Sequence, residues 1–273
     1  MSMNSFHARQ TKPRLSPPPA HKQPAGVARV DVLLVQRGLA ASRTMAQRLI
    51  ESGRVACDGG VVARASLELP PEAVLTVTDD DSDRYVSRGG LKLAGALAQT
   101  GIAVAGKTCL DVGQSTGGFT DCLLQAGAAH VVGIDVGHGQ LHPRLRHDQR
   151  VTASEGINAR ALTAADLGPA FPAGGFDLIV GDLSFISLTL VLPQLPALLA
   201  AHGDLLLLVK PQFEVGPDNI GKGGIVRDPA LYIEVETKLR HCAASLGLTV
   251  RAWFDSTITG GDGNREFFIW LNK

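Results

Sequence analysis

Residues 110–121 place an apolar strand, a glycine-rich loop and the start of a helix in immediate succession. The loop contains three glycines, and Asp111 stands where the strand ends. A helix that begins behind glycines offers free backbone N–H groups and the positive end of its dipole to a ligand. A second apolar strand follows and ends in Asp135, where a carboxylate can bind both hydroxyls of a ribose. The segment therefore predicts an α/β fold that binds a nucleoside-bearing cofactor.

The spacing of the glycines favours one class of cofactor. Dinucleotide-binding folds use Gly-x-Gly-x-x-Gly, whereas here Asp111 precedes a Gly-x-x-x-Gly-Gly loop. An acid at this point would repel a pyrophosphate and attract the sulfonium of S-adenosylmethionine, so we expect that cofactor. A tight turn with no ligand is the alternative. The expected cofactor-binding residues are Asp111, Gly113, Ser115, Thr116, Gly117, Gly118, Phe119, Asp135, Val136 and Asp182.

The 273 residues divide by composition into four parts. Residues 1–28 are basic and rich in proline, so we expect a disordered tail, either an artefact of the start site or a loose basic arm for RNA. Residues 29–78 predict a small α+β module, and residues 79–84 an acidic linker. From 85 to 273, strands and helices alternate, which predicts a mostly parallel, Rossmann-like sheet with one antiparallel strand.

The composition restricts the environment and the partners of the chain. Formal net charge is zero, so a nucleic acid would need local basic patches. The four cysteines show no paired spacing, which fits a reducing cytoplasm rather than a zinc site or a disulfide framework. No apolar run is long enough to span a bilayer, so we expect no membrane partner.

Two charged residues stand at the carboxyl ends of predicted strands, 178–182 and 205–210. These are Asp182 and Lys210, and open α/β sheets bind ligands at such ends. Lys92 and Glu266 could converge on the same cleft. Such a set suits methyl transfer to a ribose hydroxyl: a neutral Lys210 would accept or steer the hydroxyl proton, a neighbouring ammonium would favour that neutral form, and carboxylates would hold both amines. Alternatively, Lys92 is a solvated helix residue and Glu266 a surface strand residue.

Several motifs together resemble the hemolysin A (TlyA-type) rRNA methyltransferases. These join an S-four-like RNA-binding module, named for a ribosomal protein, to a methyltransferase domain like that of the FtsJ ribose methylases. The matching segments lie at 29–55, 85–93, 111–121, 135–141, 182–187, 210–214 and 263–266. The resemblance implies a class I methyltransferase fold and 2′-O-methylation of cytidine in large-subunit, and in some members small-subunit, ribosomal RNA. It also implies a catalytic tetrad of Lys92, Asp182, Lys210 and Glu266, and a cofactor role for Asn158.

The resemblance makes ribosomal RNA or a ribosomal subunit the expected partner of this chain, which we expect to act as a monomer. Arginines can neutralise phosphates, although from 30 to 77 five of them are offset by five acids. A solvated helix face is the alternative reading. The expected RNA-binding residues are Arg29, Arg37, Arg43, Arg48, Arg54, Arg64 and Arg88.

Three other readings stay open at this point. His138 and His142 have a spacing that suits a metal on a helix, but the glycines and Pro143 around them argue against a helix, so we expect no metal. A non-catalytic ribosome assembly factor would retain the fold without turnover, and cofactor binding would separate the two. A cytolysin would need a membrane-inserting amphipathic segment, and none is evident.

Overall fold

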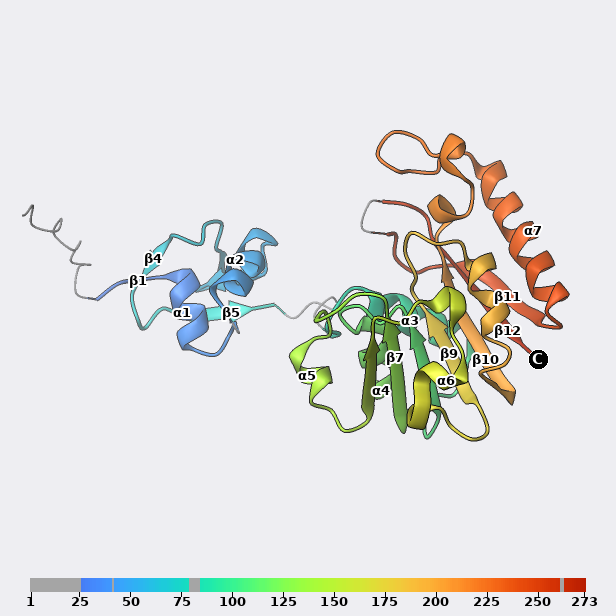
Figure 1. The fold of residues 1–273 in the computed structure, drawn as a ribbon. Coiled ribbons are helices and arrows are strands. Elements are labelled where there is room, and N and C mark those ends of the chain that lie inside the picture. Colours follow the sequence, from blue (N-terminus) through green and yellow to red (C-terminus); the bar gives the residue numbers. More distant parts are fainter. Residues whose placement is uncertain (1–25, 41, 79–83, 261–262) are drawn as a thin grey trace, which may run out of the picture. The chain divides into compact units, whose positions relative to one another are not determined.

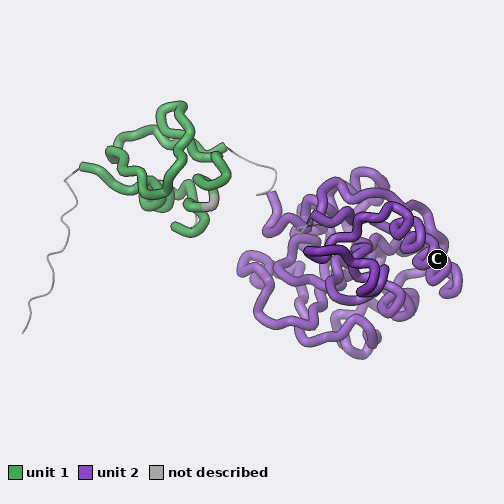
Figure 2. The backbone as a smooth tube through the Cα atoms, turned by 90° about the horizontal axis from the view of Figure 1, so that it is seen from above, with its two compact units in different colours: residues 1–79 green, residues 80–273 purple. Residues whose placement is uncertain are grey.

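The computed structural model describes residues 26–40, 42–78, 84–260 and 263–273, apart from the side chain of Arg48. Residues 1–25 of the expected disordered tail and residues 79–83 of the acidic linker lie outside these ranges, whereas Ala28, the last residue of the predicted tail, belongs to a short strand. The chain divides into two compact units, residues 1–79 and 80–273 (Figure 2).

The small unit packs two helices against short strands (Figure 1). Its core includes Leu33 and Leu34 of one helix and Leu49 and Ile50 of the other. The Asp-Gly turn between β2 and β3 adopts positive φ at both residues, 48° and 83°, as a two-residue hairpin requires. The elements are β1 (Ala28–Arg29), α1 (Val30–Gln36), α2 (Arg43–Glu51), β2 (Val55–Cys57), β3 (Gly60–Val61), β4 (Glu68–Leu69) and β5 (Leu75–Val77).

Asp31 is a buried acid at the start of α1 and organises this unit. Its carboxylate accepts two bonds from Arg29, each 3.0 Å long, and one of 2.9 Å from Arg43. Gln47 Nε2 lies 3.3 Å from the same carboxylate. The bonds from Arg29, followed by those from Arg43 and Gln47, hold the pKa of Asp31 well below its ordinary value. Asp31 therefore joins the amino end of α1 to α2.

Replacing Asp31 with Asn should destabilise the small unit by about 1–3 kcal/mol near neutral pH, because charged hydrogen bonds to both arginines are lost. Since the folded pKa is lowered, the contribution of Asp31 is present above its unfolded pKa of 3.8 and declines as pH falls toward the folded value. Urea titrations read by hydrogen exchange in α1 and α2 should show a constant difference between wild type and D31N from pH 7 to about pH 5, and convergence from about pH 5 toward pH 2. An unchanged difference across that range would contradict this account.

The large unit is a seven-stranded sheet with helices on both faces (Figure 1). The strand order is β11-β12-β10-β9-β6-β7-β8, and β12 runs antiparallel to both of its neighbours while the other pairs are parallel. This confirms the predicted mostly parallel sheet with one antiparallel strand. The strands are β6 (Thr108–Val112), β7 (His130–Asp135), β8 (Val151–Glu155), β9 (Phe176–Gly181), β10 (Leu199–Val209), β11 (Thr249–Asp255) and β12 (Phe267–Asn272).

Burial of both sheet faces explains the continuous apolar runs in the sequence. In β10, Leu205 and Leu207 join the core beneath α7, whereas Leu206 and Leu208 join the core beneath α3 and α4. Asp228 accepts a 2.9 Å bond from the N–H of Ala230 and caps α7, and Pro229 occupies the first turn, where its missing N–H costs no helical bond. The helices are α3 (Gly89–Thr100), α4 (Gly118–Gln125), α5 (Pro143–Arg146), α6 (Ala164–Leu167) and α7 (Pro229–Ser245).

The strand ends differ slightly from the predicted ones. β9 and β10 each stop one residue early, so that Asp182 and Lys210 are the first residues of the following loops. Glu266 likewise immediately precedes β12. The sequence reading missed the edge strand β8, whose polar, half-exposed residues carry a weak apolar pattern. Asp182, Lys210 and Glu266 therefore lie in loops just outside the strands, at the carboxyl edge of the parallel part of the sheet.

Candidate functional site

The loop between β6 and α4 has a strained backbone that suits close ligand approach. Gly113 and Gly117 have φ of 86° and 93°, and Ser115 has φ of 47°. A Cβ atom on Gly113 would lie 3.1 Å from the carbonyl oxygen of Asp182. The N–H of Ser115 donates a 2.7 Å bond to Asp135 Oδ2, which fixes the loop against the end of β7. Glycine is therefore required at the tightest point of this loop.

A pocket of about 570 Å³ opens beside this loop, and we call it the Asp135 pocket. Its size falls in the usual range for small-molecule sites. Asp135 also accepts a 2.7 Å bond from the N–H of Gly137, so two backbone donors orient its carboxylate. Six of the expected cofactor residues line the pocket: Gly113, Ser115, Asp135, Val136, Asn158 and Asp182.

A smaller hollow of about 160 Å³, the loop pocket, lies at the start of α4. Thr116, Gly118 and Phe119 line it, together with Asp182 and Lys210. Gly117 lines none of the described pockets; a Cβ atom there would lie 2.4 Å from Leu145 Cδ1. Its place in the site is therefore indirect, through packing against α5.

Asp111 lies behind the pocket wall rather than in it. It is fully buried, and its Oδ2 accepts bonds of 3.0 and 2.7 Å from the N–H and hydroxyl of Thr120. Burial raises the pKa of Asp111 to about 7, and the charge of Asp182 adds to that rise, while the bonds from Thr120 oppose it. Asp111 thus ties β6 to the first turn of α4, and the structure gives no direct path from its carboxylate to a ligand in the described pockets.

Substituting Asp111 with Asn should flatten the dependence of stability on pH. Because the folded pKa is raised above 3.8, the wild-type protein binds the extra proton only when folded, so its stability falls as pH rises from about 4 to 7. The ionised form costs on the order of a few kcal/mol above that range. Thermal melts of D111N should lack this decline, and its disadvantage against wild type should shrink as pH rises. If the stability of wild type and D111N fell equally between pH 4 and pH 7, groups other than Asp111 would cause the pH dependence.

The four residues of the expected tetrad form two close ion pairs. Lys92 Nζ lies 2.6 Å from Glu266 Oε2, and Lys210 Nζ lies 2.7 Å from Asp182 Oδ1. Lys92, Lys210 and Glu266 line a cavity of about 400 Å³, the lysine pocket. Lys92 and Glu266 are 8% and 3% exposed, so neither is a solvated surface residue. A buried pair, Lys92 with Glu266, and a half-buried pair, Lys210 with Asp182, thus contribute three of their four side chains to one cavity.

Ser184 and Phe185 connect the pockets, since both line the Asp135 pocket and the lysine pocket. The hydroxyl of Ser184 accepts a 2.8 Å bond from Lys210 Nζ. Phe185 is 91% exposed at φ 63°, and its ring centroid lies 5.1 Å from that of Phe213. An exposed aromatic side chain held in a strained backbone thus stands where the two cavities meet.

Most of the expected RNA-binding arginines of the small unit have partners within it. Besides Arg29 and Arg43 on Asp31, Arg37 donates to the carbonyls of Pro71 and Ala73, and Arg54 to that of Thr78. In the large unit, Arg88 Nη2 lies 3.4 Å from the carbonyl of Thr259. Arg64 is exposed. Their contact with RNA stays a prediction, and some of these arginines clearly also support the fold.

The histidines have local roles near α5. His142 Nδ1 accepts a 3.2 Å bond from the N–H of Arg144, and His147 Nδ1 lies 2.7 Å from the carbonyl of Pro143. Within the described ranges, no group of three or more His, Cys, Asp or Glu residues is arranged to hold a metal ion. No helix in the same ranges has the length and apolar character needed to cross a membrane.

Sequence reasoning gave no role to several residues of the site. Gln140 and Ile157 line the Asp135 pocket, and Ser87 and Gly89 line the loop pocket. Ser184 contacts Lys210 directly. Most of these residues lie within the family motifs at 85–93, 135–141 and 182–187, so the motifs could have identified them as candidates. Spacing along the chain does not reveal which side chains of a motif line a pocket.

Comparison with known proteins places this site in a family. Residues 85–273 match the FtsJ-like methyltransferase model and residues 28–75 match the S4 domain. The 16S/23S rRNA (cytidine-2′-O)-methyltransferase TlyA of Mycobacterium tuberculosis is 48% identical over 244 residues, which cover 89% of each chain.

Two further relatives extend the match. The 23S rRNA (cytidine-2′-O)-methyltransferase TlyA of Campylobacter jejuni is 33% identical over 256 residues, covering 88% of this chain and 97% of the relative. The solved structure of a hemolysin-type protein from Streptococcus thermophilus superimposes with a TM-score of 0.69 at 39% identity, covering 91% of this chain and 89% of the other. These matches confirm the resemblance seen in the sequence motifs. The chain therefore belongs to the FtsJ-like methyltransferase family, within the TlyA-type group that joins an S4 domain to the methyltransferase domain.

Proposed function

We propose that this chain transfers a methyl group from S-adenosylmethionine to the ribose 2′-hydroxyl of a cytidine in ribosomal RNA. The observation that carries the proposal is the meeting of the Asp135 pocket and the lysine pocket at Ser184 and Phe185. One cavity suits a nucleoside-bearing cofactor, and the other presents two lysines and a carboxylate to a second substrate. The names of the relatives from Mycobacterium tuberculosis and Campylobacter jejuni support ribosomal RNA as that substrate.

The residues of the Asp135 pocket fit S-adenosylmethionine. Asp135 has a carboxylate with two oriented oxygens for the ribose hydroxyls, and Asn158 and Val136 line the same cavity. Gly113 allows close approach of the backbone, because a Cβ there would press on Asp182. When bound, this cofactor supplies an electrophilic methyl group on a sulfonium. Asp182 lines both the Asp135 pocket and the loop pocket, on the side that faces Lys210.

Lys210 is the residue that we propose to accept or steer the proton of the 2′-hydroxyl. As a neutral amine its Nζ has two N–H donors and one lone pair, and the two N–H groups are directed at Asp182 and Ser184. The lone pair is then available to accept the proton of a substrate hydroxyl in the lysine pocket as the methyl group is transferred to the hydroxyl oxygen. Glu266 holds Lys92 in the same cavity, where the Lys92 ammonium would stabilise negative charge on that oxygen. Phe185 offers an exposed ring of the kind on which an unstacked base can pack.

The small S4 unit would supply affinity for folded RNA, through shape and local arginines rather than through net charge. A ribosomal substrate would place the enzyme in the cytoplasm. The relatives differ in the RNA that they are named for, both subunit RNAs in one and 23S RNA alone in the other. We propose the large-subunit RNA as the principal target of this chain and the small-subunit RNA as an additional one.

Ribose methylation mapped on ribosomal RNA from cells with and without this protein tests the proposal directly. We expect at least one 2′-O-methylcytidine in large-subunit RNA to disappear when the protein is absent. The purified protein should restore the mark on subunits from the deficient cells when S-adenosylmethionine is added. Identical methylation maps, together with no transfer to either subunit, would leave a non-catalytic assembly factor as the better account.

A further inference from the structure

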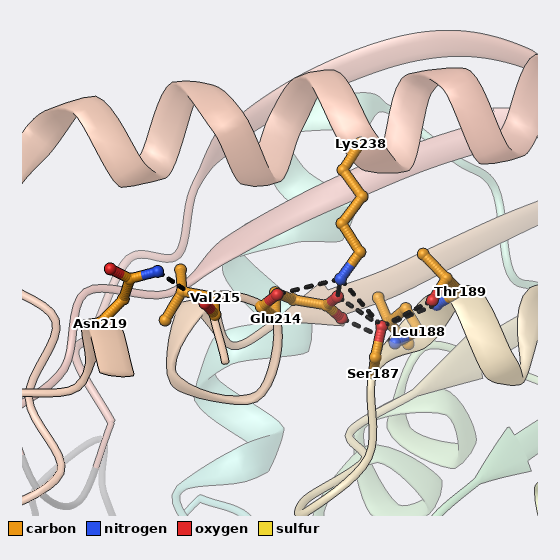
Figure 3. Close-up of polar contacts among 7 residues, drawn as sticks. All are labelled: Ser187, Leu188, Thr189, Glu214, Val215, Asn219 and Lys238. Atoms are coloured by element: carbon orange, nitrogen blue, oxygen red, sulfur yellow. Dashed lines mark hydrogen bonds and ion pairs between the residues drawn. The ribbon is translucent and has the colours of Figure 1, made fainter. Parts of the chain in front are cut away.

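Glu214 is a buried carboxylate that lies outside the pockets described above. It follows the short 3₁₀ turn η6 (Pro211–Phe213) after β10, and its side chain is 1% exposed. It accepts bonds of 2.6 Å from Ser187 Oγ, 2.7 Å from the N–H of Leu188 and 2.9 Å from Lys238 Nζ (Figure 3). A carboxylate satisfied by three donors, one of them charged, forms a strong and geometrically defined junction.

The partners of Glu214 come from segments far apart in the sequence. Ser187 and Leu188 belong to the loop that begins with Asp182 after β9 and continues into η4 (Leu188–Leu190). Glu214 belongs to the loop that begins with Lys210 after β10. Lys238 reaches down from α7 and also donates a 2.9 Å bond to the main-chain carbonyl of Glu214 (Figure 3). One carboxylate therefore fastens the Asp182 loop to the Lys210 loop, and α7 secures the junction.

The other direct polar contacts that the described residues show between these two loops lie at the pocket itself, where Lys210 contacts Asp182 and Ser184. Those contacts must remain available to a substrate, so they are poorly suited to holding the loops in place. Phe185 and Phe213, which also pair across the two loops, stand between the pocket contacts and the Glu214 junction in the sequence of each loop. The arrangement of Lys210, Asp182 and Ser184 thus depends on the contacts that Glu214 makes between the two loops.

We propose that Glu214, supported by Lys238, is a positioning residue for methyl transfer. It holds the two strand-end loops in the register that brings Lys210 against Asp182 and Ser184. Glu214 lines neither the Asp135 pocket nor the lysine pocket, so it acts through these residues and not on the substrate. The inference rests on the proposed methyltransferase function, and it assigns to that function a residue, Glu214, that lines neither pocket.

Four variants separate positioning from plain stabilisation. Glu214→Ala removes all three bonds, whereas Glu214→Gln keeps an acceptor for Leu188 and a group that Ser187 can bond. Lys238→Met removes the ion pair and the other bonds from Lys238, to the Glu214 carbonyl and to Ser187, but it leaves the bonds from Ser187 and Leu188 to Glu214. The matched control is Asp204→Ala in the middle of β10, which removes a 2.8 Å bond from Trp270 Nε1 and a contact with Lys107. This control lowers stability without touching either loop.

Single-turnover methyl transfer to ribosomal subunits is the main measurement, made below the melting temperature of every variant. We expect E214A to lower the rate at saturating RNA by about 10- to 100-fold, since small misplacement of reacting groups has effects of that size. The affinity for S-adenosylmethionine and the KM for RNA should stay close to wild type. E214Q should recover most of the rate, K238M should be intermediate, and D204A should match wild type despite its lower melting temperature.

Hydrogen exchange on the same proteins gives a readout that does not depend on activity. E214A should exchange faster than wild type at 183–190 and 211–216, while β6 and β7 stay protected. A wild-type rate for E214A, or unchanged exchange in these segments, would overturn the positioning role. Absence of methyl transfer by the wild-type protein would instead refute the proposed function, and exchange alone would then decide whether Glu214 fastens the two loops.

Discussion

Lys210→Ala should reduce methyl transfer to ribosomal RNA by about 10³-fold, within the range known for loss of a proton-transferring side chain. The reason is geometric: Lys210 Nζ is held by Asp182 and Ser184 at 2.7 and 2.8 Å, and one of its directions faces the lysine pocket. Single-turnover transfer of labelled methyl groups to purified subunits measures the loss. Calorimetry should show that S-adenosylmethionine still binds, because the Asp135 pocket keeps its lining.

A matched lysine variant controls for the removal of a positive charge. Lys107 contacts Asp204 at 3.5 Å, at the end of the sheet opposite to the pockets, and Lys107→Ala should transfer methyl groups at the wild-type rate. Lys210→Met, which keeps the length of the side chain, should be as inactive as the alanine variant. Near-normal turnover of K210A on ribosomal subunits would show that another group handles the proton. Loss of cofactor binding in K210A would show that Lys210 supports the cofactor pocket instead.

The sheet could be predicted from the sequence because its signal is local. A buried parallel strand needs apolar residues on both faces, so Leu205–Leu208 could hardly be anything but a core strand. The edge strand β8 was not predicted because its residues are only partly buried, so apolar and polar residues alternate only weakly along it. The same logic explains the strand ends, since Asp182 and Lys210 break the apolar runs at the point where the chain leaves the core.

The site was predicted less evenly, because partners distant in the sequence decide what a charged residue does. Asp111 was expected to face the cofactor, yet it turns toward Thr120 and is sealed inside the fold. The contacts of Arg29 and Arg43 with Asp31 were not predicted either, and the expected contact of both arginines with RNA stays a prediction. Glu214 received no role, because its partner Lys238 lies on a helix that no spacing rule connects to it.

Asp135→Ala should weaken S-adenosylmethionine binding by about 100-fold, since each hydrogen bond from a ribose hydroxyl to a charged acceptor is worth about 1.5–3 kcal/mol. The variant also releases the N–H of Ser115, which has φ of 47° and loses the bond that fixes it. The control is Glu155→Ala: Glu155 pairs with Asp135 in the sheet register and binds the N–H of Gly139, but it does not line the pocket. Calorimetry on both variants measures the difference, and near-equal affinities would remove Asp135 from the cofactor site.

Comparing two ligands tells where Asp135 acts. S-adenosylhomocysteine carries the same ribose as S-adenosylmethionine but lacks the positive charge on sulfur. If Asp135 binds the ribose, D135A should lose the same factor of affinity for both ligands, because the lost bonds are common to them. A larger loss for S-adenosylmethionine would instead place the carboxylate near the sulfonium. Asp182, which lines both the Asp135 pocket and the loop pocket, is the carboxylate better placed for that charge, so Asp182→Asn should discriminate between the two ligands where D135A does not.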